Sequence, residues 1–108
     1  MTTTVLIVDD HLLVRQGIRL LLQADPEIEV IGEAANGDDA VTEVRLKHPD
    51  VVLMDLLMPG LDGVAATAVI HREVPQTEIV VLTSLHEDAA AMAAMRRRSP
   101  PRASSFPP

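Results

Sequence analysis

Residues 5–10 read VLIVDD, four apolar residues that run directly into two aspartates. Apolar runs of the same length return at residues 51–54 and 79–82, and residues 28–31 read IEVI, a similar run that Glu29 interrupts. Runs this short, rich in valine and isoleucine and apolar at every position, are typical of strands buried on both faces of a parallel sheet. The sequence therefore predicts four such strands.

Segments with helical spacing separate these runs and follow the last one. In the first segment the spacing predicts an apolar face made of Val14, Ile18, Leu21 and Leu22, and Pro26 ends the helix. A fourth helix is expected over residues 87–97, where acids lie in the first turn and arginines in the last.

The second and third helices are bounded by capping residues and prolines. Asn36 or Asp38 is expected to cap the second helix, which stops before Pro49 because a residue that precedes proline avoids helical angles. Asp62 is expected to cap the third helix, which stops before Pro75. The inward residues are predicted to be Ala40, Val41 and Val44 in the second helix, and Val64, Ala65, Ala68 and Val69 in the third.

Strand and helix therefore alternate four times along the chain. Such alternation requires right-handed crossovers and a parallel sheet with helices on both faces. The predicted fold class is α/β, a doubly wound parallel sheet. In sheets of this kind the functional groups gather at the carboxyl ends of the strands.

The composition fits one globular domain of 108 residues, of which 47% are hydrophobic and 23% charged. A formal net charge of -7 argues against direct binding of nucleic acid by electrostatics. The absence of cysteine excludes disulfides and cysteine-bound zinc. No basic leader and no long apolar segment is found, so the sequence predicts a cytoplasmic protein that does not engage a membrane.

Oxygen-bearing side chains follow three of the predicted strands. Asp9 and Asp10 follow the first strand, Asp55 follows the third and Thr83 follows the fourth. If the first and third strands are neighbours, the three carboxylates converge, and their repulsion requires a cation, for which the oxygen donors favour Mg²⁺. Mg²⁺ beside a carboxylate is the arrangement needed to transfer phosphate onto it. Asp55 is therefore predicted as the nucleophile, Asp9 and Asp10 as metal ligands and Thr83 as a hydroxyl donor.

Each of these residues also has an ordinary structural explanation. Asp9 and Asp10 could cap a helix, Asp55 could be a loop acid and Thr83 could cap the next helix. Their coincidence at one edge of the sheet favours a site. No glycine-rich phosphate loop follows the first strand, so nucleotide binding is disfavoured. The histidines have no ligand-like pairing and are predicted to be surface residues: His11, His48, His71 and His86.

Three segments resemble the signature segments of the receiver domain of bacterial two-component response regulators, a flavodoxin-like fold of the CheY type. They are residues 5–11, 51–63 and 79–84, at the family's spacing, and the resemblance extends from about residue 4 to residue 97. Residues 11–17 resemble regulators that carry a LuxR-type helix-turn-helix output domain. The resemblance implies the strand order 2-1-3-4.

The resemblance also implies roles for individual residues. Asp55 would accept a phosphoryl group from a phosphohistidine on a sensor histidine kinase. Asp9, Asp10, Asp55 and the backbone carbonyl of Leu57 would hold Mg²⁺, and Thr83 would turn toward the phosphoryl oxygens as the switch hydroxyl. The family's activity is a stoichiometric phosphotransfer with slow self-dephosphorylation, so a turnover enzyme is not expected.

The sequence departs from the family's pattern after residue 97. Receivers end with a fifth strand that bears a lysine, an aromatic switch residue and a fifth helix, whereas residues 98–108 read RSPPRASSFPP and the one lysine is Lys47. We therefore expect an incomplete receiver domain over residues 1–97, with the fifth strand and fifth helix missing. A disordered tail rich in proline, arginine and serine is expected over residues 98–108. A truncated or frame-shifted coding region would explain this pattern.

Two consequences follow for function. The uncovered fourth strand predicts marginal stability, self-association or pairing with another receiver, and the missing lysine predicts impaired switching. The alternative hypothesis is a non-phosphorylated interaction module, a pseudo-receiver that binds a kinase or a regulator. A magnesium-dependent phosphatase is disfavoured, because Leu57 stands where such enzymes need a second aspartate. Direct binding of nucleic acid is not expected, since no output domain is present.

Overall fold

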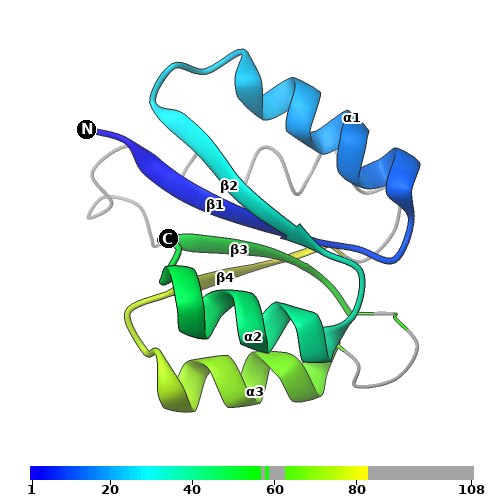
Figure 1. The fold of residues 1–108 in the computed structure, drawn as a ribbon, viewed down its shortest axis with the longest axis vertical. Coiled ribbons are helices and arrows are strands. Elements are labelled where there is room, and N and C mark those ends of the chain that lie inside the picture. The colour runs from blue at the N-terminus through cyan, green and yellow to red at the C-terminus, as the bar shows by residue number, and fades with distance from the viewer. Residues whose placement is uncertain (57, 59–62, 83–108) are drawn as a thin grey trace, which may run out of the picture.

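The four predicted strands form one parallel sheet in the computed structural model, which describes residues 1–56, 58 and 63–82. The strands are β1 (Thr3–Val8), β2 (Ile28–Ala34), β3 (Val51–Asp55) and β4 (Glu78–Leu82), hydrogen-bonded in the order β2-β1-β3-β4. The connecting helices are α1 (Leu12–Gln23), α2 (Gly37–Lys47) and α3 (Gly63–Glu73) (Figure 1). The predicted doubly wound, flavodoxin-like α/β fold and its strand order are confirmed.

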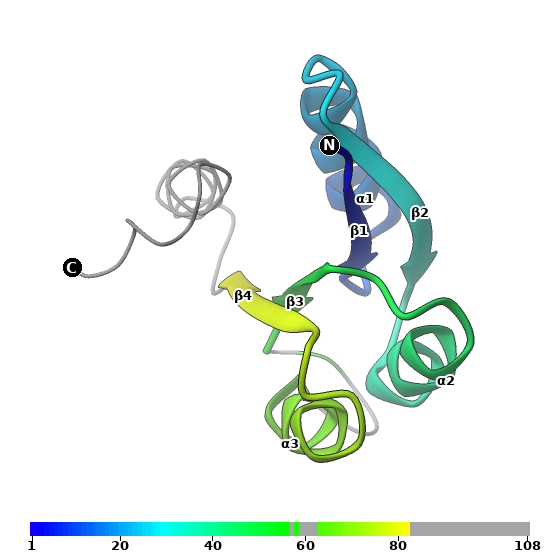
Figure 2. The ribbon, with the colours of Figure 1, turned by 90° about the vertical axis from the view of Figure 1, so that its left-hand side faces the viewer.

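Alternate residues of the two central strands face two separate halves of the core. One set packs against α2 and α3, and the other packs against α1. The first set is Leu6, Val8, Val52 and Met54, and the second is Val5, Ile7, Val51 and Leu53. All are at most 4% exposed. Figures 1 and 2 show the corresponding layers, with α1 on one side of the sheet and α2 and α3 on the other.

Helix α2 has the cap and the buried face that the sequence predicts. Asn36 precedes the helix in an extended conformation, and its side-chain oxygen accepts a hydrogen bond of 2.8 Å from the backbone N–H of Asp39. This bond satisfies one of the unpaired donors of the first turn. The helix ends at Lys47, before Pro49. The predicted inward residues Ala40, Val41 and Val44 are all buried.

The predicted face of α1 is wrong at one position. Ile18 and Leu22 are buried and Val14 is half-buried, but Leu21 is 60% exposed. Val14, Ile18 and Leu22 lie four residues apart and form a narrow stripe toward the sheet. Leu21 is rotated by about 100° around the helix axis from Leu22, so its side chain lies outside this stripe.

The predicted face of α3 is wrong at two of its four positions, since Ala65 and Val69 are half-buried and Val69 packs against the core. The helix buries Gly63, Ala66 and Ile70, whereas Val64 is 61% exposed and Ala68 is also exposed. Residues 63–70 read GVAATAVI, so the helix is apolar on nearly every side and the spacing does not determine which stripe is buried. The buried stripe is the one that packs against β3 and α2.

The predictions about the carboxyl-terminal part of the chain fall outside the described residues. They concern the cap Asp62, the helix over residues 87–97, the missing fifth strand and helix, and the tail over residues 98–108. Within the described residues, β4 is the last strand on its side of the sheet. Across the same residues, no helix has the length and apolar character that a bilayer crossing requires.

Candidate metal centre

Two buried aspartates stand at the carboxyl ends of the central strands. Asp9 directly follows β1 and Asp55 is the last residue of β3. The two strands pair in parallel with Val8 opposite Met54, so the next residue of each strand reaches the same edge of the sheet. Asp9 is 5% exposed and Asp55 is 8% exposed, whereas Asp10 is half-buried.

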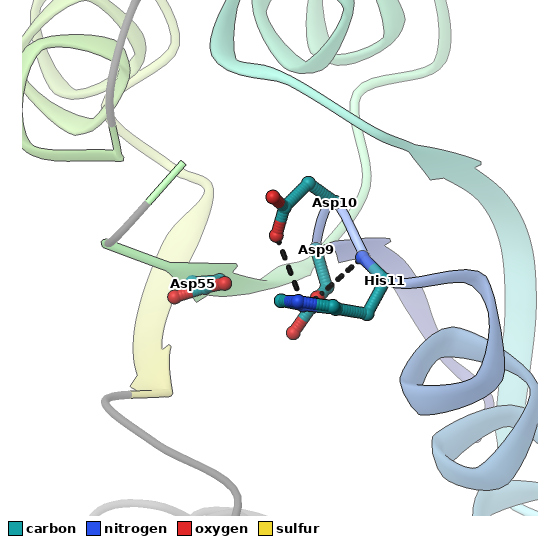
Figure 3. Close-up of side chains that lie close together, drawn as sticks. All are labelled: Asp9, Asp10, His11 and Asp55. Atoms are coloured by element: carbon teal, nitrogen blue, oxygen red, sulfur yellow. Dashed lines mark hydrogen bonds and ion pairs between the residues drawn. The ribbon is translucent and has the colours of Figure 1, made fainter. Parts of the chain in front are cut away.

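The structure brings the three predicted carboxylates together. One ligand atom from each of Asp9, Asp10, His11 and Asp55 lies within 4.8 Å of the others. Figure 3 shows Asp55 facing this group from β3, while the other three residues come from the loop between β1 and α1. Carboxylates this close repel one another unless a positive group lies among them.

His11 places an imidazole, which is positive when protonated, against two of the carboxylates. Its backbone N–H donates to Asp9 Oδ1 at 2.8 Å, and its Nδ1 lies 3.0 Å from Oδ1 of Asp9 and 3.0 Å from Oδ1 of Asp10 (Figure 3). The hydrogen bond to Asp9, followed by the charge of Asp10, raises the pKa of His11 above its ordinary value of 6.5.

His11 is therefore part of the cluster, although the sequence analysis left it out. The side chain is exposed, as predicted, and its contacts with Asp9 and Asp10 were not anticipated. The signal that could have found it is its position directly after Asp9 and Asp10, at the end of a buried strand.

A network from α1 and β2 holds the backbone at the end of β1. Arg15 Nη1 donates to the carbonyl oxygen of Asp9 at 2.6 Å, and Arg15 Nε donates to Glu33 Oε1 at 2.8 Å. Arg19 Nε donates to the other oxygen of Glu33 at 2.7 Å. Burial acts to raise the pKa of Glu33, but the hydrogen bonds from Arg19 and Arg15, together with their charges, outweigh it and lower the pKa below 4.5.

Gly63, the first residue of α3, lies against the backbone of Asp55. A Cβ at this position would contact the carbonyl oxygen of Asp55 and lie 2.6 Å from the Cα of Leu56. Every residue except glycine would place an atom there, so glycine lets α3 approach the end of β3. The roles of Gly63, Arg15 and Glu33 were not predicted, because each depends on how one element packs against another.

The donor set fits a hard divalent cation. Asp9, Asp10 and Asp55 offer carboxylate oxygens, which Mg²⁺ prefers, and Asp9 and Asp55 are buried where their repulsion favours a cation. The imidazole of His11 adds a nitrogen, a donor that suits transition metals better than Mg²⁺. The predicted carbonyl of Leu57 and hydroxyl of Thr83 lie outside the described residues.

Comparison with known proteins gives consistent matches. The chain matches the family model of the response regulator receiver domain over residues 5–98. It is 50% identical over 88 residues to the response regulator protein VraR of Staphylococcus epidermidis, which covers 82% of this chain and 42% of that protein. It is 50% identical over 84 residues to the transcriptional regulatory protein LiaR of Bacillus subtilis, which covers 78% of this chain and 40% of that protein. The chain therefore spans about two fifths of the length of these curated relatives.

Solved structures share the fold. A two-component response regulator of the LuxR family from an Aurantimonas species aligns with a TM-score of 0.74 and 32% identity, over 96% of this chain and 79% of that chain. The response regulator domain of Thermotoga maritima CheB aligns with a TM-score of 0.74 and 32% identity, over 89% of this chain and 72% of that chain.

Proposed function

The chain belongs to the response regulator receiver domain family, and from this premise we propose that Asp55 accepts a phosphoryl group from the phosphohistidine of a sensor histidine kinase. The observation that carries the proposal is the convergence of Asp9, Asp10 and Asp55 at the carboxyl ends of β1 and β3. A single buried carboxylate would be an ordinary structural acid. Three carboxylates from two strand ends form a place for a cation next to a nucleophile.

Asp55 is the nucleophile in this proposal. One oxygen of its carboxylate forms a bond to phosphorus, and the bond between phosphorus and the donor's imidazole nitrogen breaks. The electron pair of that bond stays on the nitrogen, and the product is an acyl phosphate on Asp55. Bound Mg²⁺ supplies positive charge that offsets the charge of the phosphoryl oxygens.

The neighbouring residues hold the reacting groups in place. Asp9 and Asp10, together with Asp55 and the backbone carbonyl of Leu57, are the proposed ligands of Mg²⁺. Thr83 is the proposed switch hydroxyl and donates a hydrogen bond to a phosphoryl oxygen. The domain accepts one phosphoryl group at a time and is not a turnover enzyme. Attack of water on the acyl phosphate returns Asp55 to a carboxylate only slowly.

We propose that switching is impaired. The one lysine of the sequence is Lys47, at the end of α2. Its Nζ donates to the carbonyl oxygen of Ile31 at 3.1 Å and lies 2.8 Å from Glu43 Oε1. Both contacts lie away from the Asp9, Asp10, His11 and Asp55 cluster, so Lys47 does not supply the lysine that receivers pair with their phosphoryl group.

The same feature supports the alternative, a pseudo-receiver that binds a kinase or another regulator without being phosphorylated. In either case the proposed setting is the cytoplasm, and the proposed output is regulation of transcription within a larger system. Self-association or pairing with another receiver is proposed on the edge position of β4 among the described strands.

Phosphorylation by a small-molecule donor separates the two functions. The protein is incubated with acetyl phosphate and Mg²⁺, and its intact mass is measured. We expect one phosphoryl adduct per chain, which is lost in Asp55→Asn. The matched control is Asp38→Asn, because Asp38 is an exposed carboxylate in the first turn of α2 and should leave the adduct unchanged.

Two results would contradict the proposal that Asp55 is the phosphoacceptor. A folded wild-type protein that gains no adduct supports the pseudo-receiver. An adduct that persists in Asp55→Asn assigns the chemistry to another residue.

A further inference from the structure

We propose that Arg15 is a positioning residue for the metal-binding carboxylates, which fixes the peptide between Asp9 and Asp10 and thereby sets the affinity for Mg²⁺. The inference rests on the proposed function, since it assumes that Asp9 and Asp10 hold a cation. Arg15 does not contact the phosphoryl group in this account. It acts through the backbone of the residues that bind the ion.

The guanidinium of Arg15 joins three elements. It projects from α1, donates through Nη1 to the carbonyl oxygen of Asp9 at 2.6 Å, and donates through Nε to Glu33 of β2 at 2.8 Å. The Arg15 side chain is 14% exposed, so water competes little for these bonds. The planar guanidinium can donate to the Asp9 carbonyl and to Glu33 at the same time, in a geometry that a lysine ammonium could not reproduce.

The bond to the Asp9 carbonyl restrains both aspartates. The carbonyl of Asp9 and the N–H of Asp10 belong to one planar peptide unit. A restraint on the oxygen therefore also fixes the orientation of the N–H and the position of the Cα of Asp10. On the other side of the residue, the N–H of Asp9 donates to the carbonyl of Ala34 at 3.1 Å. The backbone of Asp9 is therefore held at both its donor and its acceptor.

Glu33 keeps the charge of Arg15 from opposing the cation. An unpaired guanidinium beside the metal site would repel Mg²⁺, whereas the carboxylate of Glu33 offsets that charge and orients the guanidinium. Glu33 receives one arginine on each oxygen, Arg15 at 2.8 Å and Arg19 at 2.7 Å. The two arginines and the glutamate thus form one hydrogen-bonded network that holds the backbone directly after β1.

Arg19 provides a matched control within the same network. It lies one helical turn after Arg15 and makes the equivalent bond to Glu33. Within residues 1–56, the hydrogen bond to the carbonyl of Asp9 comes from Arg15 and not from Arg19. A purely structural role predicts similar effects at the two positions, and a positioning role predicts different ones.

The test compares Arg15→Met and Arg19→Met, which keep the aliphatic stem and remove the donors. Mg²⁺ affinity is measured by isothermal titration calorimetry, and thermal unfolding is followed by circular dichroism in the presence of a chelator. Both variants should lose stability, because each breaks a bond to Glu33. Only Arg15→Met should bind Mg²⁺ more weakly, by about tenfold, the lower end of what loss of an outer partner of a metal ligand costs. Arg15→Lys should show an intermediate loss.

The outcomes are distinguishable. Absence of Mg²⁺ binding by the folded wild-type protein defeats the proposed metal site itself. Binding by the wild-type protein with equal affinity in Arg15→Met leaves the metal site intact and overturns the positioning role, as does an equal loss in Arg19→Met. If Arg15→Met does not fold, Arg15→Lys and Arg19→Lys make the same comparison, and wild-type affinity in Arg15→Lys overturns the proposal.

Discussion

Replacement of Gly63 by alanine tests how closely α3 is set against the end of β3. Gly63 is the buried first residue of α3. A Cβ at this position would contact the carbonyl oxygen of Asp55, lie 2.6 Å from the Cα of Leu56 and lie 3.0 Å from the carbonyl carbon of Asp55. All of these are backbone atoms, which cannot rotate away as the end of a side chain can.

The expected cost follows from these distances. The new methyl group has to move about 0.8 Å from the Cα of Leu56 to reach an ordinary contact of 3.4 Å. Overpacking of this kind costs about 1–3 kcal/mol, which for a domain of this size lowers the melting temperature by about 4–24 °C. The displaced atoms belong to Asp55 and its neighbour. We therefore also expect phosphorylation by acetyl phosphate to slow by about tenfold, because a misplacement of 1 Å can cost about a hundredfold in rate.

Thermal unfolding and the time course of the intact-mass adduct measure the two effects. Gly17→Ala is the matched control, because Gly17 lies inside α1 and nothing among the described residues comes within 4 Å of a Cβ placed there. Alanine in a helix interior should stabilise the protein by about 0.5–1 kcal/mol relative to glycine. If Gly63→Ala melts at or above the wild-type temperature and is phosphorylated at the wild-type rate, the argument about close approach is refuted.

Two further substitutions test the packing and the charge network. Ile70→Ala should destabilise the protein by about 2–5 kcal/mol because Ile70 is 1% exposed. Val64→Ala should change stability by less than about 0.5 kcal/mol because Val64 is 61% exposed, and equal losses in urea unfolding would mean that the buried face of α3 is assigned wrongly. Glu33→Gln tests pH dependence: the pKa of Glu33 in the folded protein lies below 4.5, so the carboxylate adds stability at neutral pH that is lost as the pH falls through that folded-state value. The stability difference between wild type and Glu33→Gln should therefore shrink below about pH 4.5, and a difference that stays constant from neutral to acid pH would exclude this linkage.

The sequence predicted the sheet well because the runs that form its two central strands, residues 5–8 and 51–54, are apolar at every position. Short runs of this kind indicate strands that are buried on both faces, and residues 5–8 and 51–54 are buried in the structure. The convergence of Asp9 and Asp55 follows directly, since parallel neighbours end at the same edge. That part of the candidate site needed only the positions of the aspartates and the order of the strands.

The helix faces were harder to predict, for a physical reason. Both α1 and α3 carry more apolar residues than they bury, so Leu21 and Val64 fit an apolar stripe in the sequence and remain exposed in the structure. What selects the buried stripe is the surface of the sheet and of α2, which periodicity along one helix does not describe.

The supporting residues of the site could not be predicted by the same reasoning. Arg15 joins Glu33 across 18 positions, and Gly63 matters only because α3 approaches Asp55. His11 is closer to the sequence signal, since it adjoins the paired aspartates, but its contact with both carboxylates depends on how the loop turns after β1. These roles arise from tertiary contacts.

A crystal structure of the protein grown with Mn²⁺ in place of Mg²⁺ tests the account most directly, because the anomalous signal of Mn²⁺ locates the ion without assumptions. We expect one peak within bonding distance of carboxylate oxygens from Asp9, Asp10 and Asp55. A well-ordered crystal in which the peak lies elsewhere, or in which these carboxylates surround no ion at a saturating concentration of Mn²⁺, would contradict the account.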